Sequence, residues 1–596
     1  MRELWYNNGE FMKRNTLRNY IQELLIDVLK SDFPLHANLD FSLAEPPNRD
    51  FGDYATNLPL LLAKRTGNKP KEVAKTLIPR LQGLDRDREA AFLEASERAG
   101  FINFRFYPEY LLKILAQINA DGGGFRASQA GGGKKILVEY FQNNVAKPPH
   151  VGHVRSAVIG DSILRILRYL GYAAESDTHI GDWGTQFGIL LSAYKEFINS
   201  GGERTQIASS PIEELNKLYV VTTQKIEDQP ELLEKGKQEF AKLEKGDTEN
   251  RSLWEWFVAV SAEDFEKYRV LLDILPFDHA LGESFYLDKM PEVLADTKKL
   301  GLLTESEGAQ IVNLEDKKLG VAIMVKSDGA TTYLLRDLAT IKHRISRQKF
   351  SKILYVVDSR QAHHFQQVFE IASRLGYVKG SGMLLHVDFG FMSLPEGAIS
   401  TRKGSVVSLK NLIEETQKRT LQIIEEKNPS LPKKNMVARQ VALAAIKYFD
   451  LSHNRKSDIV FRWDEVLDFE GNSGPYLQYA YVRISGILRK LGQPPPAQFA
   501  GRVKKIAFDQ TEMRLLRKLA KFPDAVEDAA ADYMPHIICT YLYELSQDFN
   551  SFYEAVWVLK EKDKELKNFR IALIAACGTA IQRGLGLLGI EAIQEM

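Results

Sequence analysis

The chain has 596 residues, of which 44% are hydrophobic and 26% are charged, and its formal net charge is +1. This composition is typical of a folded globular protein with room for about three or four domains, and it excludes a fibrous or intrinsically disordered chain. The balanced charge excludes a uniformly basic nucleic-acid-binding protein, so any surface for nucleic acid must be local.

The cysteines and the apolar segments indicate the cellular compartment of the protein. Only Cys539 and Cys577 occur, each in an apolar helical stretch, which predicts buried thiols in a reducing compartment and excludes a zinc site built from them. No apolar run reaches the roughly 18 residues of a membrane span, and the first residues lack the apolar core of a signal peptide. We therefore expect a cytoplasmic protein with no membrane-spanning segment.

The first region, residues 1–120, is predicted to be a small α+β domain. Apolar residues recur at helical spacing over Leu17–Leu29, Leu58–Ala63 and Lys71–Leu81, and a strand is predicted over Gly100–Phe106. The glycines at 121–124 and 131–133 are typical of a flexible linker, so we place a domain boundary there. A surface loop within one domain is the alternative.

Residues 134–470 alternate between strand and helix patterns, which predicts a Rossmann-like domain with a parallel sheet. The predicted strands are Ile136–Tyr140, Gly320–Val325, Thr331–Leu335, Lys352–Val357 and Leu385–Phe391. The predicted helices are Val151–Leu170, Leu338–Gln348 and His363–Leu375. A charged helical stretch from about residue 189 to 281 interrupts the alternation, and we predict that it is an insertion with solvated helix faces.

Residues 471–596 are predicted to form an all-helical bundle. Apolar stripes at helical spacing run over Tyr476–Leu491, Gln510–Ala530, Met534–Phe552 and Lys567–Leu588. The basic residues Arg483, Arg489 and Lys490 form either a local nucleic-acid surface or an ordinary solvated face, and the second is the default. The predicted fold class is a multidomain α/β protein, with an α+β domain first and a helical bundle last.

The motif His150-Val-Gly-His153 opens the predicted helix that follows the first strand of the parallel sheet. A helix N-terminus in this position presents free N–H groups and the positive end of the helix dipole, so it attracts phosphate. The two imidazoles lie on neighbouring faces of the first turn, where each can hydrogen-bond phosphate oxygens. Gly152 leaves the backbone bare, so a flat purine or ribose can approach. The motif predicts a nucleotide site with a leaving pyrophosphate; two surface histidines are the alternative.

Acidic and amide side chains are predicted at strand ends near this helix: Glu139, Asn144, Tyr333, Asp337 and Gln361. Two carboxylates with an amide and a phenol suit a planar guanidinium, whose N–H donors carboxylates bind in bidentate fashion. A lysine ammonium would leave acceptors of such a site unpaired. The alternatives are that Asp337 caps a helix or pairs with Arg336, and that Glu139 is a strand-edge charge. Composition alone favours these alternatives.

Two further loops complete the candidate site. His179–Gly188 contains three glycines, which imply a tight turn, and its Trp183 offers a packing surface. The segment 398–406 carries hydroxyls and two cations. Such a loop can close over a triphosphate and stabilise the charge of the departing pyrophosphate, although in isolation it is an ordinary basic loop.

With these residues in place, the chain resembles the arginyl-tRNA synthetases, a family of class I aminoacyl-tRNA synthetases. His150–His153 is similar to the HIGH motif, Ile399–Gly404 to the KMSKS loop, and His179–Gly188 to the HxGDWGxQFG segment of the arginyl enzymes. Other similar segments are Tyr333–Asp337, Val356–Gln361 with His364-Phe365, Phe469–Tyr479, Asp50–Asn57 and Leu587–Ile590. The resemblance therefore spans nearly the whole chain.

The resemblance implies ligation of L-arginine to its tRNA through an arginyl-adenylate, with ATP as a substrate, Mg²⁺ with the ATP, and activation that needs bound tRNA. The implied arginine-binding residues are Glu139, Asn144, His153, Tyr333, Asp337 and Gln361. The implied ATP-binding residues are Lys147, His150, Gly152 and His153, and the implied catalytic residues are Lys147, His150, His153, Ser400, Arg402 and Lys403. Residues 1–120 would contact the tRNA elbow, 471–596 would bind the anticodon, and the protein would be a monomer without a metal of its own.

The chain departs from the family pattern at a few positions. Thr401 stands where KMSKS has its second lysine, and the resemblance implies that Lys147 compensates. Phe141-Gln-Asn143 replaces the usual Ser-Ser-Pro, Thr178 replaces an asparagine, and the chain ends Glu595-Met596 where an arginine commonly precedes the methionine.

Two other classes of protein stay open. A nucleotidylyl transferase that does not act on tRNA would not need the helical C-terminal third. A catalytically silent RNA-binding relative should have lost pocket residues. Because Glu139, His150, His153 and Asp337 all remain, the synthetase is favoured.

Overall fold

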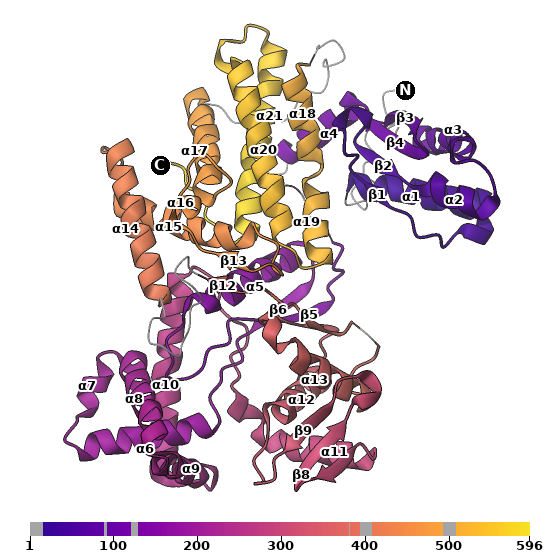
Figure 1. Ribbon diagram of the computed structural model, residues 1–596. Helices are drawn as coiled ribbons and strands as arrows, with labels where there is room; N and C mark the ends of the chain where they lie inside the picture. The colour runs from indigo at the N-terminus through magenta and orange to yellow at the C-terminus, as the bar shows by residue number, and fades with distance from the viewer. Residues whose placement is uncertain are drawn as a thin grey trace. The chain divides into compact units, whose positions relative to one another are not determined.

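The computed structural model describes residues 16–88, 92–120, 125, 129–380, 382–393, 408–492 and 508–596 (Figure 1). The chain forms two compact units. The first consists of Met1–Ala130, Pro475–Gly586 and Glu591–Met596, and the second of Gly131–Gly474 and Leu587–Ile590. Across the described ranges, none of the helices combines the length and the apolar character of a membrane span.

The N-terminal part of the first unit is an antiparallel sheet with helices, as predicted. The strands β1 (Leu43–Ala44), β2 (Tyr54–Thr56), β3 (Phe92–Arg98) and β4 (Phe101–Phe106) lie in the order β1-β2-β4-β3. The helices are α1 (Leu17–Asp32), α2 (Leu58–Thr66), α3 (Pro70–Arg88) and α4 (Pro108–Ala120). The first helix begins where the Thr16 hydroxyl accepts a hydrogen bond from the Asn19 amide, which satisfies a free N–H group of the first turn.

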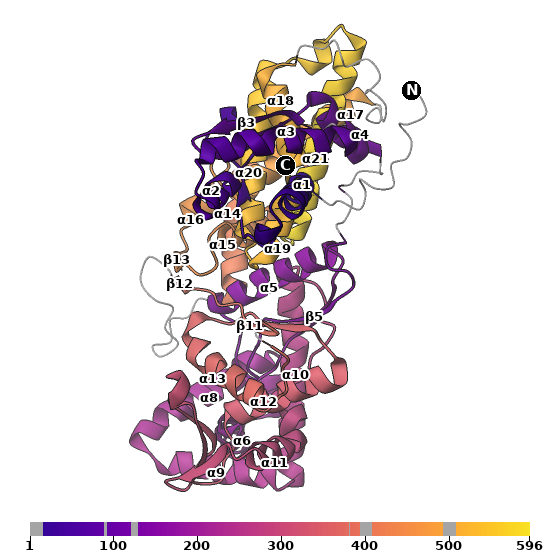
Figure 2. The same cartoon turned by 90° about the vertical axis from the view of Figure 1, so that its right-hand side faces the viewer.

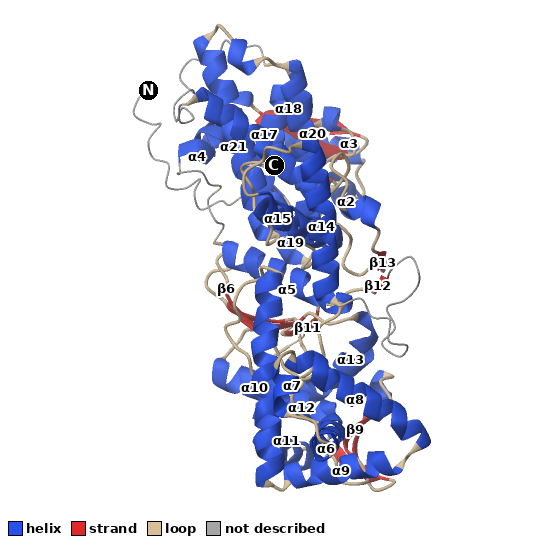
Figure 3. Ribbon diagram, turned by 90° about the vertical axis from the view of Figure 1, so that its left-hand side faces the viewer, coloured by secondary structure: helices blue, strands red, loops and turns tan. Residues whose placement is uncertain are grey.

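The C-terminal part of the first unit is helical, as the apolar stripes predicted, and Figure 3 shows it almost entirely in blue. Its helices are α17 (Gly474–Leu491), α18 (Gln510–Ala520), α19 (Phe522–Ala531), α20 (His536–Ala555) and α21 (Lys564–Leu587). The predicted single helix 510–530 is wrong, because it is divided between α18 and α19. Pro523 lies in the first turn of α19, where its missing N–H group costs nothing, whereas inside a helix it would break the hydrogen-bond ladder.

The second unit contains the predicted parallel sheet. Its strands β5 (Lys135–Glu139), β6 (Ala173–Asp177), β10 (Lys352–Tyr355) and β11 (Leu384–His386) lie in the order β11-β10-β5-β6. Helix α5 (Val151–Tyr169) covers one face, and α12 (Tyr333–His343) and α13 (Ala362–Arg374) cover the other (Figure 2). The chain leaves β5 toward β6 and later returns to β10 on the other side of β5, so the connections diverge between β5 and β10. Ligands of such sheets bind at this point.

Two strand predictions in this region are corrected by the structure. Residues 331–335 are not a strand, because α12 already begins at Tyr333 and buries Leu334, Leu335 and Leu338. A short apolar run does not by itself distinguish a strand from a buried helix, and tertiary contacts decided for the helix. The predicted strand 320–325 exists as β9 (Val321–Val325), but it belongs to a separate antiparallel sheet with β7 (Leu303–Ser306) and β8 (Ala309–Asn313).

The charged stretch after residue 188 is helical, as predicted. It contains most of α6 (Thr185–Asn199) and all of α7 (Arg204–Ala208), α8 (Pro211–Asp228), α9 (Glu231–Glu244) and α10 (Thr248–Leu271). These helices have an apolar core of their own around Phe187, Leu191, Phe240 and Phe257. The remaining elements of the second unit are α11 (Met290–Lys299), α14 (Leu409–Lys427), α15 (Lys434–Leu451), α16 (Trp463–Val466), β12 (Met392–Ser393) and β13 (Ile459–Val460).

Candidate active site

A cavity of about 570 Å³ opens at the carboxyl ends of the parallel strands. Its lining includes Glu139 at the end of β5, the first turn of α5 from His150, and the loop 357–361 after β10. These segments meet where the connections of the sheet diverge, so the cavity occupies the position that ligands take in open α/β sheets. Asp337, one turn into α12, and His364, from the first turn of α13, face it from the other layer.

The two histidines form the first turn of α5 together with its free amides. The Gly152 N–H donates to Nδ1 of His150 at 3.0 Å, and the His150 N–H donates to Nδ1 of His153 at 3.1 Å. Because each Nδ1 accepts a backbone proton, each neutral ring carries its own proton on Nε2. Burial and the neighbouring His150 lower the pKa of His153 to about 3, and burial and Arg360 lower the pKa of His150. Both rings are therefore neutral N–H donors at the N-terminus of a helix.

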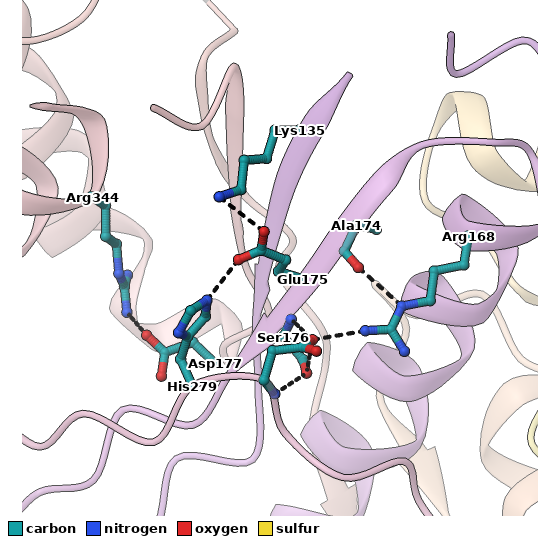
Figure 4. Close-up of polar contacts among 9 residues, drawn as sticks. Lys135, Arg168, Ala174, Glu175, Ser176, Asp177, His279 and Arg344 are labelled. Carbon is teal, nitrogen blue, oxygen red and sulfur yellow. Dashed lines mark hydrogen bonds and ion pairs between the residues drawn. The ribbon is translucent and has the colours of Figure 1, made fainter. Parts of the chain in front are cut away.

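A buried arginine of the protein itself forms ion pairs with the carboxylates at the strand ends. Arg344, fully buried, pairs with Glu139 at the end of β5 and with Asp177 at the end of β6. The pair with Asp177, at 2.7 Å, is drawn in Figure 4. Gln142 donates to the other oxygen of Glu139 at 3.2 Å. Burial works to lower the pKa of Arg344, but the two carboxylates outweigh it and raise that pKa. Both oxygens of Glu139 are therefore already engaged by the protein.

Strand β6 is held at its outer edge by a polar cluster, which is also drawn in Figure 4. The chain around His279 adds to this edge, with the His279 amide donating to the Ser176 carbonyl at 2.9 Å. Glu175 accepts from the His279 ring at 2.6 Å and pairs with Lys135 of β5 at 2.9 Å. These contacts cover an otherwise unpaired strand edge and fix the position of Asp177 beside Arg344.

Two further acidic side chains line the cavity, Asp337 with 30% and Glu283 with 12% of the side chain exposed. Asp337 accepts a hydrogen bond from the His364 ring at 2.6 Å. Burial works to lower the pKa of His364, but the hydrogen bond and the charge of Asp337 outweigh it, so the pKa is raised. Glu283 pairs with Arg336, yet burial dominates and raises the pKa of Glu283 to about 7.

Asp182 holds Glu283 in place. Its carboxylate accepts from the Ser284 amide at 2.8 Å and from the Ser284 hydroxyl at 2.6 Å, and the Glu283 amide donates to the Ile180 carbonyl at 3.0 Å. A side chain at Gly282 would meet Asp182 at 2.1 Å, so only glycine allows this approach. The glycine-rich turn at 179–188 therefore positions an acid that lies about a hundred residues further along the chain.

Most of the sequence-predicted site residues lie together in the cavity lining: Glu139, Asn144, His150, Gly152, His153, Tyr333, Asp337 and Gln361. Lys147 does not line it; its Nζ lies 5.1 Å from the centre of the Tyr219 ring, and burial lowers its pKa. Ser400, Arg402 and Lys403 lie outside the described residues. Tyr333 and Asp337 reach the cavity from the first two turns of α12, not from the strand end that the sequence predicted.

Gln142, Glu283, Arg360 and His364 were not predicted as site residues, and all four line the cavity; His179, which also lines it, was predicted only as part of the loop 179–188. His364 lies one turn beyond Gln361 in the same amphipathic helix, so helical spacing was a usable signal. Glu283 carries no such signal, because it begins a short 3-10 helix (Glu283–Lys289) after the helical insertion and reaches the cavity only through tertiary contacts.

Family models match nearly the whole chain. Residues 115–463 match the model described as "tRNA synthetases class I (R), catalytic domain". Residues 477–596 match the "DALR anticodon binding domain", and residues 15–106 match the "Arginyl tRNA synthetase N terminal domain".

Individual proteins are similar over the same length. The arginine–tRNA ligase of Alkaliphilus metalliredigens is 38% identical over 553 residues, which cover 92% of this chain and 95% of that protein. The arginine–tRNA ligase of Pseudomonas syringae is 35% identical over 98% of this chain and 100% of that protein. Among solved structures, Thermus thermophilus arginyl-tRNA synthetase superposes with a TM-score of 0.82 at 26% identity, covering 98% of this chain and all of that one.

Proposed function

This chain belongs to the arginyl-tRNA synthetase family and ligates arginine to tRNA through an adenylate, and we propose which of its residues carry that reaction. The observation that carries the proposal is a single cavity in which helix-terminal histidines face carboxylates from other elements. A phosphate-binding helix N-terminus and an acidic pocket for a cation are the two halves that an arginyl-adenylate needs.

The acidic half of the cavity is proposed as the arginine site. Asp337 and Glu283 offer carboxylates and Tyr333 a hydroxyl, which together match the fork of donors on a guanidinium. The oxygens of Glu139 are engaged by Arg344 and Gln142, and each retains a lone pair for a further donor. We assign Glu139, Asn144 and Gln361 to the amino-acid end of the substrate, the α-ammonium and α-carboxylate.

The helix-terminal half is proposed as the ATP site. The α-carboxylate of arginine attacks the α-phosphorus of ATP in line and expels pyrophosphate, so charge moves onto phosphate oxygens. The Nε2–H groups of His150 and His153 donate to these oxygens, and the bare backbone at Gly152 admits the nucleoside. Catalysis is then positioning and charge stabilisation, and no protein side chain forms a covalent bond. Ser400, Arg402 and Lys403 are proposed to close over the pyrophosphate.

Magnesium is proposed to accompany ATP. Within the described ranges, no group of three or more histidine, cysteine or acidic side chains is placed to hold a metal ion. We propose that the nucleotide phosphates supply oxygen ligands of the ion.

The second step transfers the arginyl group to the ribose hydroxyl of the terminal adenosine of tRNA. We propose residues 1–120 as a tRNA-elbow domain, 134–470 as the catalytic domain and 471–596 as the anticodon-binding domain. We further propose a cytoplasmic monomer whose arginine activation needs bound tRNA.

The test of this function is ATP–pyrophosphate exchange with each amino acid, with and without total tRNA. We expect exchange only when both arginine and tRNA are present. Exchange with arginine alone would support the synthetase activity and reject its dependence on tRNA. Absence of exchange with any amino acid, while tRNA still binds, would reject the activity.

The pH dependence of arginine binding follows from Glu283. Its pKa is raised to about 7 by burial, so the carboxyl is charged above pH 7 and protonated below it. The guanidinium of arginine stays protonated over this pH range. The protein therefore binds arginine tightly at high pH, and this affinity is lost as the pH falls through 7. A single such group gives about a tenfold rise in the arginine Kd between pH 8 and pH 6, measured by calorimetry. Glu283→Gln should weaken binding at pH 8 and flatten the profile, whereas the exposed Glu292→Gln should leave it unchanged.

Lys147 provides a separate prediction. If it replaces the loop lysine that Thr401 lacks, Lys147→Ala lowers the activation rate by roughly 100-fold, the size expected for one charge-stabilising group. Arginine affinity should fall less than threefold, because Lys147 does not line the cavity. Single-turnover adenylate formation measures the activation rate, and calorimetry measures the affinity for arginine. Equal losses in both would contradict the assignment.

A further inference from the structure

Glu139 and Asp177 place two carboxylates side by side at the ends of neighbouring parallel strands. The two residues are direct partners in the register of β5 and β6, so their side chains leave the sheet on the same face. Neighbouring strands lie about 4.8 Å apart, and like charges directly opposite one another destabilise a sheet. Both side chains are buried, with 7% of Glu139 and 3% of Asp177 exposed. A cation beside them is needed to keep both charges buried.

Arg344 is this cation, and its side chain is wholly buried. Its Nη1 pairs with Oε2 of Glu139. Its Nη2 donates to Oδ2 of Asp177 at 2.7 Å, as Figure 4 shows. A guanidinium is planar and holds its donors in a rigid fork, so contacts through both arms fix the direction in which it meets each carboxylate. The ammonium group of a lysine is a point charge and would not fix that direction.

A change of helical winding places Arg344 at this position. Helix α12 ends at His343, and Arg344–Gln348 form a π-helical turn that ends at Lys349, whose φ is +58°. Such turns are rare and occur frequently at functional sites. Arg344 follows Asp337 by seven residues, which is nearly two turns at 3.6 residues per turn. The same stretch of chain therefore supplies Asp337 for the proposed guanidinium site and Arg344 beside Glu139.

Glu139 also faces the cavity, whereas Asp177 and Arg344 do not line it. Gln142, another residue of the lining, donates to Oε1 of Glu139 at 3.2 Å and adds no charge. The two carboxylates and the guanidinium together carry a net charge of −1. The cavity is the side from which a further cation can reach Glu139, and a cationic group bound there would neutralise the buried cluster.

We propose that Arg344 is a positioning residue that holds Glu139 for the α-ammonium group of arginine. Because Arg344 pairs with one oxygen of Glu139 and Gln142 donates to the other, the carboxylate is held from rotating, and its remaining lone pairs accept the ammonium. Asp177 contributes indirectly, because it anchors the second arm of Arg344. The inference rests on the proposed assignment of Glu139 to the amino-acid end of the substrate and names the residues that orient it.

A purely structural role of Arg344 predicts a different pattern of binding. If Arg344 only compensated the charges of the two strand ends, its loss would loosen the sheet and weaken every ligand of the cavity alike. If Arg344 orients Glu139, the loss falls on ligands that carry the amino group. The selectivity between ligands with and without this group therefore separates the two roles.

The experiment measures the Kd of three ligands for the full chain by calorimetry. L-Arginine has both groups of the amino-acid end, agmatine keeps the amine and lacks the carboxylate, and 5-guanidinopentanoate keeps the carboxylate and lacks the amine. Arg344→Lys retains the positive charge and loses the fork of donors. It should raise the Kd of L-arginine and of agmatine about tenfold, the size of one hydrogen bond to a charged group. The Kd of 5-guanidinopentanoate should change less than about threefold.

Three further variants support the comparison, and thermal unfolding reports the fold of each. Arg347→Lys changes an exposed arginine of the same π-helical turn and should match the wild type. Asp177→Asn releases the second arm of Arg344 from outside the cavity, so it should act in the same direction, and it decides the question if Arg344→Lys does not fold. In Glu139→Gln the carboxylate is already absent, so adding Arg344→Lys should change the Kd of L-arginine less than about threefold.

The outcomes separate this inference from the proposed function. A wild type that binds 5-guanidinopentanoate as tightly as L-arginine, or a Glu139→Gln variant that distinguishes them as well as the wild type does, would reject the assignment of Glu139 itself. If the wild type distinguishes them through Glu139 and Arg344→Lys, or Asp177→Asn in its place, keeps the wild-type ratio of the two Kd values, the positioning role alone is overturned. Equal losses for all three ligands would show a purely structural role and would also overturn it.

Discussion

Asp337→Ala should remove nearly all arginine-dependent turnover while tRNA binding persists. The substitution leaves the substrate guanidinium and the His364 ring without the carboxylate that holds them, at 2.6 Å in the case of His364. Truncating one partner of a hydrogen-bonded charge pair that the bound substrate buries costs about 2–5 kcal/mol, which corresponds to about a 30- to 5,000-fold loss in kcat/KM for arginine. Steady-state aminoacylation and arginine calorimetry measure the effect.

Two comparisons make this prediction specific. Asp337→Asn keeps the shape of the side chain and removes its charge, so it should retain the fold and still lose most of the arginine affinity. Asp316→Ala removes an exposed carboxylate, paired with Arg374, and should change kcat/KM less than twofold. An unchanged arginine Kd in Asp337→Ala would contradict the assignment of the acidic half of the cavity.

Substitutions of His153 should distinguish the roles of its two ring nitrogens. Nδ1 accepts the His150 amide, and Nε2 is the donor proposed for phosphate. His153→Asn keeps an acceptor near the Nδ1 position and loses the distal donor, so stability should hold while the rate of adenylate formation falls about 100- to 1,000-fold. His153→Gln carries an amide that reaches the Nε2 position and should recover part of that loss. Rapid-quench measurement of adenylate formation with tRNA present tests both variants.

The pH profile provides an independent check on His153. Its pKa is lowered to about 3, so the ring is neutral throughout the working range. Adenylate formation at saturating arginine should therefore show no titration of this group between about pH 6 and 9. A loss of rate that follows protonation of His153 near neutrality would contradict its role as a neutral donor.

Local sequence rules predicted the position of the histidine turn correctly. A strand, a short loop and a helix that begins at a polar residue are determined by neighbouring residues, since capping and helical spacing act within a single turn. His150, Gly152 and His153 therefore lie in the structure where the sequence placed them, at the first turn of α5. The helical C-terminal region follows from the same periodic patterns, whereas two of the strands predicted in the region of the parallel sheet do not belong to that sheet.

The positions and partners of the acidic side chains in the cavity depend on contacts between residues that are distant in sequence. Residues 331–335 suit a strand or a buried helix equally well, and packing against the sheet made them the start of α12, which moved Asp337 onto a helix. Arg344 pairs with Glu139 and Asp177, about two hundred residues earlier, so it engaged a carboxylate that the sequence left open for substrate.

The sequence by itself determined the family, most of the helices and the position of the histidine turn of α5, because these depend on short-range patterns and on motifs of adjacent residues. Only the tertiary structure decided which carboxylates are open to a substrate and that Glu283 joins Asp337 in one cavity. The physical reason is that charge pairing and burial act through space, and the chain separation of the partners carries no periodic signal.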